Sequence, residues 1–386
     1  MGKVFKYLLP KRIDASNSND ILQDINTQIE ANECSSVEFD AKELEYISSA
    51  GLRVLLSVNN NSGKNVSVID VSKDVYEIFD VTGFNQILKI KKKMREVSID
   101  GCKEIGRGFC GTVYRLDDET IIKVYESIDN IAAIENEKKM AQLAIVNGIP
   151  TAISYDIVRV GENYGAVYEL LDAKSFNDIV RKSPERTEEI TKRLVEFLKK
   201  IHSIEINDKF LPSAKKVFES YLLTIKDCFE ESFFSKLSDL VNTIPESKNV
   251  VHGDAHMKNI MMVDGEPMFI DMDTLAAGNP IFDLQAIYTA YITFAEDEPE
   301  NNMDFLGITQ DQAIEIWNYI MNYYYDDKSK EEKKSILEKI QILSYIRMMY
   351  IIVASPSPLK ESDLNKMRLV HSVEHLKELV PKYDRF

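Results

Sequence analysis

The apolar residues of 1–88 alternate between short continuous runs and runs with helical spacing. Continuous runs at 37–39 and 66–69 predict buried strands, whereas spacing of three or four residues predicts helices over 19–31, 50–58 and 75–79. Strands that alternate with helices predict one sheet covered by helices. We therefore expect a small α/β domain in this part of the chain.

Two different patterns follow that domain. Residues 96–171 predict mainly strands and turns with one helix near 130–147, and residues 172–386 are mostly helical. Within the helical part, residues 250–271 carry apolar runs on either side of Asp264-Gly265, which predicts a β-hairpin. We therefore expect an α+β protein in which a strand-rich part and a helical part follow the first domain.

The segment 89–95, Lys-Ile-Lys-Lys-Lys-Met-Arg, lies between these patterns and has five basic residues in seven. We interpret it as a basic linker rather than a nucleic-acid patch, because it is short and has no interleaved aromatic residues. The predicted organisation is a domain at 1–88, the linker at 89–95, a strand-rich lobe at 96–171 and a helical lobe at 172–386.

The composition narrows the class of protein. The 386 residues include 47 basic and 63 acidic side chains, a net charge of −16, which argues against a nucleic-acid binder or a polybasic membrane-surface protein. The most apolar late stretch, 340–354, is shorter than the roughly 20 residues that cross a bilayer. The N-terminal residues lack a signal-peptide pattern, and the four cysteines form no CxxC pair. We expect a cytoplasmic protein without a membrane or nucleic-acid partner.

A glycine-rich segment runs Ile-Gly-Arg-Gly-Phe-Cys-Gly-Thr-Val over residues 105–113. Glycines let backbone N–H groups approach phosphate oxygens without a Cβ in the way. A dinucleotide-binding fingerprint would open a helix, but β-favouring residues and an Asp-Asp turn follow here. A glycine turn between two strands is typical of kinases. We expect a nucleotide to be lined by Gly106, Gly108, Gly111 and Val113.

Lys123 follows in the next predicted strand, 12 residues after Gly111. Its ammonium group can neutralise phosphate charge at that place, but it needs an acidic partner to hold it. Glu137 on the following helix is the favoured partner. Glu135, two residues earlier and on another face of that helix, is the alternative.

Two acidic segments flank the predicted hairpin. His-Gly-Asp-Ala-His-Met-Lys-Asn over residues 252–259 precedes its first strand, and Ile-Asp-Met-Asp over 270–273 ends its second. Asp254 can accept a proton from an acceptor hydroxyl, and Asn259 can reach a metal ion. The hairpin returns Asp271 beside Asn259, where their oxygens suit Mg²⁺ bound to nucleotide phosphates.

Residues 96 to about 375 resemble the aminoglycoside phosphotransferase and choline kinase superfamily, which shares the protein-kinase fold. Residues 252–259 match its HGDxxxxN pattern, and residues 270–273 match its Ile-Asp segment. The resemblance implies a bilobal fold with a β-rich N-lobe and a helical C-lobe. It also implies that Asp254 is the catalytic base and that Asn259 and Asp271 bind Mg²⁺.

The same resemblance assigns supporting roles. Asp283 matches the aspartate that braces the catalytic loop, and His252 is expected to orient that loop through backbone contacts. Residues 165–171 match the hinge, which implies that backbone groups of Glu169 and Leu171 hold the adenine of ATP. Lys123 and Glu137 complete the implied catalytic set.

Residues 1–88 resemble the STAS domains of anti-sigma-factor antagonists. The match rests on 37–40, on Tyr-Ile-Ser-Ser-Ala-Gly-Leu-Arg-Val-Leu-Leu over 46–56, on the predicted strand at 66–69, and on 78–84. The resemblance implies Ser49 as a phosphorylation site at a helix N-terminus, whereas Ser48 replaces the usual aspartate. The other interpretation is that Ser48 or Ser49 only caps the helix.

These observations predict an ATP- and Mg²⁺-dependent phosphotransferase that moves the γ-phosphate to a hydroxyl of a small molecule. The acidic segment 295–304 favours an amine-bearing or sugar acceptor. The fused STAS domain implies regulation and a protein partner. Two alternatives stay open: a protein serine kinase acting on a STAS-domain serine, and a non-catalytic nucleotide-sensing module of an anti-sigma-type network.

Overall fold

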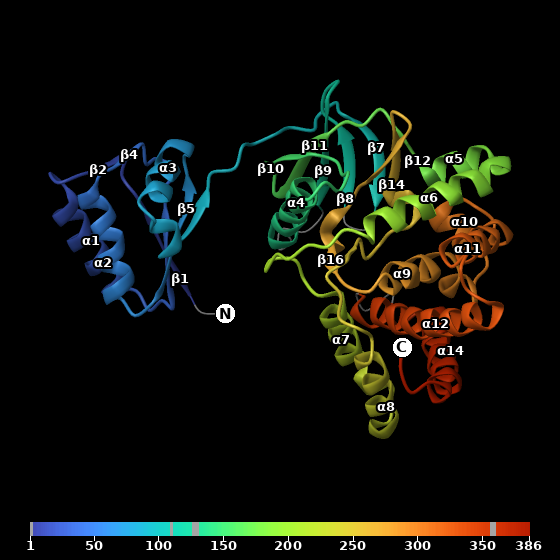
Figure 1. The fold of residues 1–386 in the computed structure, drawn as a ribbon. Helices are drawn as coiled ribbons and strands as arrows, with labels where there is room; N and C mark the ends of the chain where they lie inside the picture. Colours follow the sequence, from blue (N-terminus) through green and yellow to red (C-terminus); the bar gives the residue numbers. More distant parts are fainter. Residues whose placement is uncertain (1–2, 109–110, 126–130, 356–359) are drawn as a thin grey trace. The chain divides into compact units, whose positions relative to one another are not determined.

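The computed structural model describes residues 3–108, 111–125, 131–355 and 360–386 (Figure 1). The chain forms two compact units, residues 1–98 with 157–162, and residues 99–156 with 163–386. Each unit is described by itself below.

The first unit is built on a four-stranded parallel sheet in the order β1-β3-β5-β6. These strands are β1 (Val4–Leu8), β3 (Ser36–Asp40), β5 (Asn65–Val71) and β6 (Lys89–Lys92), and a short parallel pair joins β2 (Arg12–Ile13) to β4 (Tyr46–Ile47). The helices are α1 (Ser18–Ala31), α2 (Ser49–Asn61) and α3 (Lys73–Val81). The predicted strands at 37–39 and 66–69 and all three predicted helices are present, and Phe39, Leu55, Val68 and Phe79 are fully buried between them.

The basic segment expected to be a linker is partly strand. Lys89–Lys92 forms β6, which pairs in parallel with β5 at the edge of the sheet. Only Ile90 offers the sheet an apolar side chain, and lysines are a common way to protect an exposed sheet edge. The linker prediction for 89–92 is therefore wrong. A lysine-rich edge strand has the same composition as a solvated linker, so the sequence pattern does not distinguish them.

Gly51 allows α2 to pack closely on the strands beneath it. A Cβ at this position would lie 2.6 Å from Ile47 Cγ1 and 2.8 Å from Ile13 Cγ2. Both distances are shorter than any real carbon contact, so a larger residue would push the helix away from the core.

The second unit begins with a five-stranded sheet in the order β10-β11-β9-β8-β7. In chain order the strands are β7 (Lys103–Gly108), β8 (Gly111–Arg115), β9 (Thr120–Tyr125), β10 (Ser154–Val160) and β11 (Asn163–Glu169). Antiparallel pairing links β7 to β8, β8 to β9, and β9 to β11. Helix α4 (Ile131–Val146) follows β9 and completes this strand-rich lobe (Figure 1).

The rest of the second unit is mainly helical. In chain order the helices are α5 (Phe176–Lys182), α6 (Thr187–Ile201), α7 (Ala214–Thr224), α8 (Glu231–Asn242), α9 (Ile281–Tyr291), α10 (Asn301–Leu306), α11 (Gln310–Tyr324), α12 (Lys330–Ala354) and α14 (Asp363–Leu379). Helix α9 is buried along nearly its whole length, and α11 and α12 pack against it. The apolar stretch 340–354 is the second half of α12. Across the described ranges, no helix is both long enough and apolar enough to span a bilayer.

The predicted β segment at 250–271 divides between two small sheets. Strand β13 (Val250–Val251) pairs with β16 (Ala276–Ala277), whereas β14 (Ile260–Val263) and β15 (Glu266–Phe269) form the hairpin and β12 (Lys174–Ser175) joins its edge. The turn residues Asp264 and Gly265 have φ values of 49° and 85°. Two successive positive φ angles fit a two-residue hairpin turn, as the Asp-Gly pair predicts.

Candidate active site

The loop that carries Asp254 is held by a buried aspartate in α9. Asp283 is fully buried and accepts hydrogen bonds from the backbone N–H groups of His252 at 2.9 Å and Gly253 at 2.5 Å. It also lies 2.9 Å from Nε2 of His202, the residue after α6. Burial alone would raise the pKa of Asp283, but the contact with His202 and the backbone bond from His252 hold it below its ordinary value.

His252 connects this loop to the hairpin. Its Nε2 lies 3.0 Å from the Ile270 carbonyl oxygen, and its Nδ1 accepts the N–H of Asp254 at 3.2 Å. The ring is fully buried and lies 4.3 Å from the ring of Phe269. Burial lowers the pKa of His252. A neutral imidazole with its proton on Nε2 satisfies both contacts. His252 therefore joins the loop that carries Asp254 to the hairpin and supports that loop.

The backbone at Gly253 has a conformation that favours glycine. Its φ is 83°, and a Cβ there would lie 2.6 Å from the Thr274 carbonyl oxygen. The Thr274 hydroxyl in turn donates to the His252 carbonyl oxygen at 2.8 Å. The turn after β13 therefore presents Asp254 at a fixed place beside the end of the hairpin.

Asp254 is surrounded by hydrogen-bond donors. Its Oδ1 accepts from Arg347 Nη2 at 3.0 Å, and its Oδ2 lies 3.2 Å from Asn259 Nδ2 and 3.3 Å from His256 Nε2. Burial would raise the pKa of Asp254, but His256 and Arg347 outweigh it and hold the pKa well below the usual range. The carboxylate is therefore ionised and oriented. The sequence analysis did not predict a role for Arg347.

The hairpin brings the two predicted metal ligands to the same place. Asn259 ends the short 3₁₀ turn Met257–Asn259 before β14, and its carbonyl oxygen accepts the N–H of Ile270 at 3.0 Å. Asp271 follows directly, with a φ of 57° and with part of its side chain exposed. Left-handed backbone is uncommon for a residue with a Cβ, and aspartate and asparagine tolerate it best.

Lys123 on β9 lies between two carboxylates. Its Nζ is 2.6 Å from Asp271 Oδ1 and 3.4 Å from both carboxylate oxygens of Glu137. Burial lowers the pKa of Lys123, but the charges of Asp271 and Glu137 outweigh it, so that the pKa lies above its ordinary value. The lysine is therefore charged, and Asp271 is its closest partner.

Glu137 on α4 is the acidic neighbour of Lys123, whereas Glu135 is exposed. Glu137 is only 4% exposed and accepts hydrogen bonds from Tyr125 at 2.7 Å and Tyr168 at 2.6 Å. The two tyrosine hydroxyls are therefore the close partners of the Glu137 carboxylate, and Lys123 lies farther from its oxygens. Glu137 therefore joins α4 to β9 and β11 as well as facing Lys123.

The described part of the glycine segment lies on two antiparallel strands, β7 and β8, as the sequence predicts. Gly108 pairs with Gly111 at the end of β7 and β8, and the intervening residues 109–110 lie outside the described residues. Val113 on β8 is directly opposite Lys123 on β9, so both side chains share one face of the sheet. A Cβ at Gly106 would meet only Val113, at 3.9 Å, but one at Gly111 would lie 2.1 Å from the Val124 carbonyl oxygen.

The hinge predicted to hold adenine has part of its backbone already engaged. The N–H of Glu169 donates to the Ile153 carbonyl oxygen at 3.1 Å, and the N–H of Leu170 donates to Glu119 at 2.7 Å. The Glu169 side chain accepts the N–H of Ile153 at 2.6 Å. The Glu169 N–H is therefore engaged within the protein, so the predicted adenine contact at this residue falls to its carbonyl oxygen; the contact at Leu171 stays a prediction.

In the first unit, Ser48 and Ser49 have different environments. Ser48 is the N-cap of α2 and its hydroxyl accepts the N–H of Ala50 at 3.2 Å. Ser49 is the first residue of the helix and is exposed. The capping role and the proposed phosphorylation site therefore fall on two different residues.

The donor set fits a Mg²⁺ ion that is shared with phosphates. In the parts of the chain that the structure describes, no group of three or more His, Cys, Asp or Glu side chains could hold a metal on its own. Mg²⁺ in nucleotide sites is usually held by one or two protein oxygens together with phosphate oxygens and water. Asn259 and Asp271 supply that kind of partial set.

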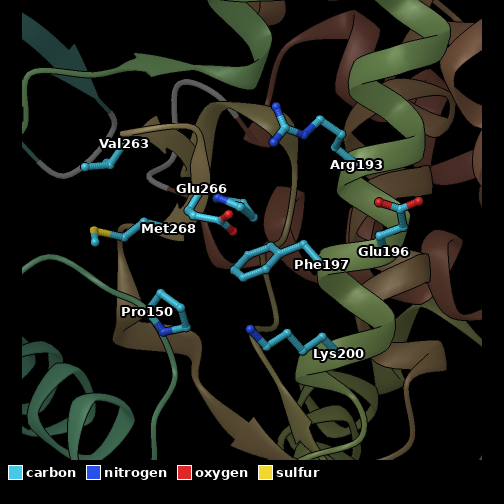
Figure 2. Close-up of a pocket in the computed structure, with 9 residues that line it drawn as sticks. Pro150, Arg193, Glu196, Phe197, Lys200, Val263, Glu266 and Met268 are labelled. Carbon is cyan, nitrogen blue, oxygen red and sulfur yellow. The ribbon is translucent and has the colours of Figure 1, made fainter.

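A separate cavity of about 640 Å³ lies between α6 and the β14–β15 hairpin (Figure 2). Arg193, Phe197 and Lys200 of α6 face Glu266 and Met268 of the hairpin across it. None of the residues proposed here for catalysis or nucleotide binding lines this cavity. Its place in the helical lobe distinguishes it from the site around Asp254.

Comparison with known proteins identifies both parts of the chain. A sequence model of the phosphotransferase enzyme family matches residues 101–308, more than half of the chain, and a model of the STAS domain matches residues 2–97. A search of curated proteins gave no match.

Three solved structures illustrate the structural likeness. A thermostable mutant of aminoglycoside phosphotransferase APH(4)-Ia in its apo form has a TM-score of 0.50 at 11% identity, over 74% of this chain and 97% of that chain. A further single-residue variant of that mutant, in a ternary complex with ADP and hygromycin B, has a TM-score of 0.50 at 10% identity, over 72% and 93%. The ADP-bound aminoglycoside phosphotransferase APH(2'')-Ib has a TM-score of 0.47 at 12% identity, over 80% and 97%. At such identities the likeness concerns the fold alone. The chain belongs to the phosphotransferase enzyme family, with a kinase-like fold that follows an N-terminal STAS domain.

Proposed function

We propose that this protein is an ATP- and Mg²⁺-dependent kinase that phosphorylates a hydroxyl group of a small molecule. The observation that carries the proposal is the convergence of two acidic segments with a largely buried lysine. The N–H of Ile270, next to Asp271, donates to the Asn259 carbonyl oxygen at 3.0 Å, and Asp271 lies 2.6 Å from Lys123. Phosphoryl transfer relies on positioning and charge stabilisation, so this arrangement of charged groups supports the proposal.

Each residue has a defined task in the proposed reaction. The acceptor oxygen forms a bond to the γ-phosphorus, the bond from that phosphorus to the bridging oxygen breaks, and ADP leaves. Asp254 orients the acceptor hydroxyl and takes its proton, while Lys123 binds phosphate oxygens. Mg²⁺, held by Asn259 and Asp271, would neutralise the charge on the phosphates.

The acidic segment 295–304 does not restrict the acceptor to amines. Glu296 accepts a hydrogen bond from Tyr345 at 3.0 Å, and Asp297 lies 2.5 Å from His371. Glu298 lies 3.4 Å from Arg368. Three carboxylates that could have attracted a cationic acceptor are therefore engaged within the helical lobe. Neutral and acidic acceptors should therefore be tested alongside amines.

The test measures nucleotide turnover by the full-length protein with Mg-ATP and, separately, Mg-GTP. Acceptors should include simple sugars, sugar acids, amino sugars, choline-like amines and an aminoglycoside, because one structural neighbour holds ADP and hygromycin B. Asp254→Asn is compared with Asp264→Asn, a matched change in the hairpin turn, and thermal unfolding shows that both variants fold. We expect product formation that Asp254→Asn abolishes and Asp264→Asn preserves.

The outcomes separate the competing functions. Unchanged turnover in folded Asp254→Asn would rule out the proposed role of Asp254. The protein serine kinase would be favoured if Ser49 became phosphorylated in an Asp254-dependent way and no small molecule accepted phosphate. Ser49 is exposed, so this alternative is worth testing. Nucleotide binding without transfer to any acceptor would favour the nucleotide-sensing module.

A further inference from the structure

Arg347 contacts the catalytic loop from α12, a helix that lies far from the loop in sequence. Its Nη1 donates to the Gly253 carbonyl oxygen at 2.6 Å, and its Nη2 donates to Asp254 Oδ1 at 3.0 Å. The arginine side chain is 13% exposed. One guanidinium therefore binds both the backbone before Asp254 and the carboxylate itself.

Helices α9 and α12 hold the same short loop from two directions. The N–H of Gly253 donates to Asp283 on α9, whereas its carbonyl oxygen accepts from Arg347 on α12. The two helices are themselves joined, since Ser344 donates to the Gln285 carbonyl oxygen at 3.2 Å and Gln341 donates to Tyr288 at 3.0 Å. Both polar groups of residue 253 are thus fixed by buried charged side chains.

The part of α12 that carries Arg347 is also joined to α7. Tyr350, one turn further along α12, stacks on Tyr221 of α7 with ring centroids 3.9 Å apart. Burial raises the pKa of the Tyr221 hydroxyl, and the charges of Arg347 and Asp254 also act on that pKa. His256 and Asn259 bind the second carboxylate oxygen, so the groups that face Asp254 leave little freedom for its side chain.

We propose that Arg347 is a positioning residue that fixes the Asp254 carboxylate in the orientation needed to receive the acceptor proton. This inference rests on the proposed function, because it assigns Arg347 a task only if Asp254 acts as the base. A planar guanidinium suits the task because its N–H groups can bind two acceptors at once, whereas lysine offers a single rotating point charge.

The test compares Arg347→Ala and Arg347→Lys with Arg368→Ala in full-length protein. Arg368 is a matched control, since its side chain is 7% exposed and donates to the Phe294 carbonyl oxygen at 2.7 Å, but it does not contact the catalytic loop. We expect Arg347→Ala to lower kcat by about 100-fold with little change in the KM for ATP, because a misplaced catalytic group loses rate rather than nucleotide binding.

Two comparisons distinguish a positioning role of Arg347 from a role in the stability of the fold alone. Added guanidinium ions should restore part of the rate of Arg347→Ala, and Arg347→Lys should restore less than the native residue. Arg368→Ala should lower the unfolding temperature without either effect.

Hydrogen exchange of the amides in 252–259 keeps the test independent of turnover. Faster exchange in folded Arg347→Ala is expected, and unchanged exchange together with a kcat within about threefold of wild type would overturn the proposal. Absence of Asp254-dependent turnover in the wild type would contradict the proposed function instead. Faster exchange would then show only that Arg347 fixes the loop, and the catalytic assignment would fall.

Discussion

The ammonium group of Lys123 lies 2.6 Å from Asp271 but 3.4 Å from Glu137. Its closest partner is thus the carboxylate that we propose as a Mg²⁺ ligand, while Glu137 is also bound by Tyr125 and Tyr168. Binding of a metal–nucleotide complex would exchange these partners, with the lysine moving to phosphate oxygens and Asp271 to the cation. In the structure, Lys123 and Asp271 thus balance each other's charge at the proposed nucleotide site.

Asp271→Asn should remove the effect of Mg²⁺ on nucleotide affinity. Without metal, a carboxylate repels the phosphates, so the variant should bind metal-free ATP at least as tightly as wild type. With Mg²⁺, wild type should gain about tenfold or more in affinity and the variant almost nothing. Calorimetric titration with ATP, in EDTA and in Mg²⁺, makes the comparison.

Asp264→Asn is the matched control for that experiment. Asp264 and Asp271 both have left-handed backbone, with φ values of 49° and 57°, and asparagine tolerates this conformation. The control should keep the full Mg²⁺ gain. A full gain in Asp271→Asn would exclude this carboxylate as a metal ligand.

Glu137→Ala should destabilise the strand-rich lobe. It would leave the hydroxyls of Tyr125 and Tyr168 buried without their acceptor and remove one of the two carboxylates near Lys123. We expect a loss of about 3 kcal/mol in the free energy of unfolding, and a smaller loss for Glu137→Gln, which keeps an acceptor. Urea unfolding measures both.

The exposed neighbour Glu135 supplies the comparison for Glu137. Glu135→Ala should change the free energy of unfolding by no more than about 0.5 kcal/mol, as exposed substitutions usually do. Equal losses at the two positions would show that the buried cluster adds no stability of its own.

The parts of the site that are close in sequence were predictable, and the long-range contacts were not. The Asp264-Gly265 turn fixes the hairpin, so the proximity of Asn259 and Asp271 follows from local rules. Helical spacing likewise places Glu137, not Glu135, on the buried face of α4.

Arg347 lies 93 residues from Asp254 in the chain, and no local pattern joins them. The available signal was a charged residue within an apolar helical stretch, which indicates that a partner exists without naming it. Strand β6 was missed for the opposite reason, since its lysines resemble solvated chain and only tertiary pairing makes them an edge strand.

The buried His252 should make the protein less stable in weak acid. Burial lowers its pKa, so the unfolded chain binds a proton below about pH 6.5 while the native protein does not. Stability from this group is therefore complete above that pH and is lost as the pH falls. We expect the free energy of unfolding to decrease between pH 7 and pH 5.

His252→Gln isolates this contribution, because glutamine offers both a donor and an acceptor but does not titrate in this range. The variant should show a shallower decrease of stability with acid than wild type. His375→Gln, a change at an exposed histidine, should leave the slope as it is. If the free energy of unfolding decreased equally steeply with acid in all three proteins, His252 would be able to take up a proton in the native state.

Ser48→Ala should weaken the start of α2. Ser48 accepts the N–H of Ala50, and loss of such a cap usually costs about 1 kcal/mol. Hydrogen exchange in residues 49–61 of the full-length chain should accelerate accordingly. Ser49→Ala should leave it nearly unchanged, because Ser49 is exposed and is not the cap; a larger effect at Ser49 would reverse the two assignments.

Gly111 and Gly106 should respond differently to alanine although both belong to the same glycine pattern. At Gly111 a Cβ would lie 2.1 Å from the backbone oxygen of Val124, so β8 would have to move away from β9. That movement would separate Val113 from Lys123 and should cost about 3 kcal/mol in the free energy of unfolding. At Gly106 the added carbon would meet Val113 at 3.9 Å, an ordinary contact, so the fold should be kept.

Unfolding followed by circular dichroism, together with ATP titration, distinguishes the two positions. Gly111→Ala should unfold at lower denaturant concentration, whereas Gly106→Ala should unfold like wild type and bind ATP more weakly if the backbone at residue 106 approaches phosphate. Equal stability of the two variants would show that the sheet can absorb the contact with Val124. In that case the requirement for glycine at residue 111 would come from the nucleotide rather than from the packing of β8 on β9.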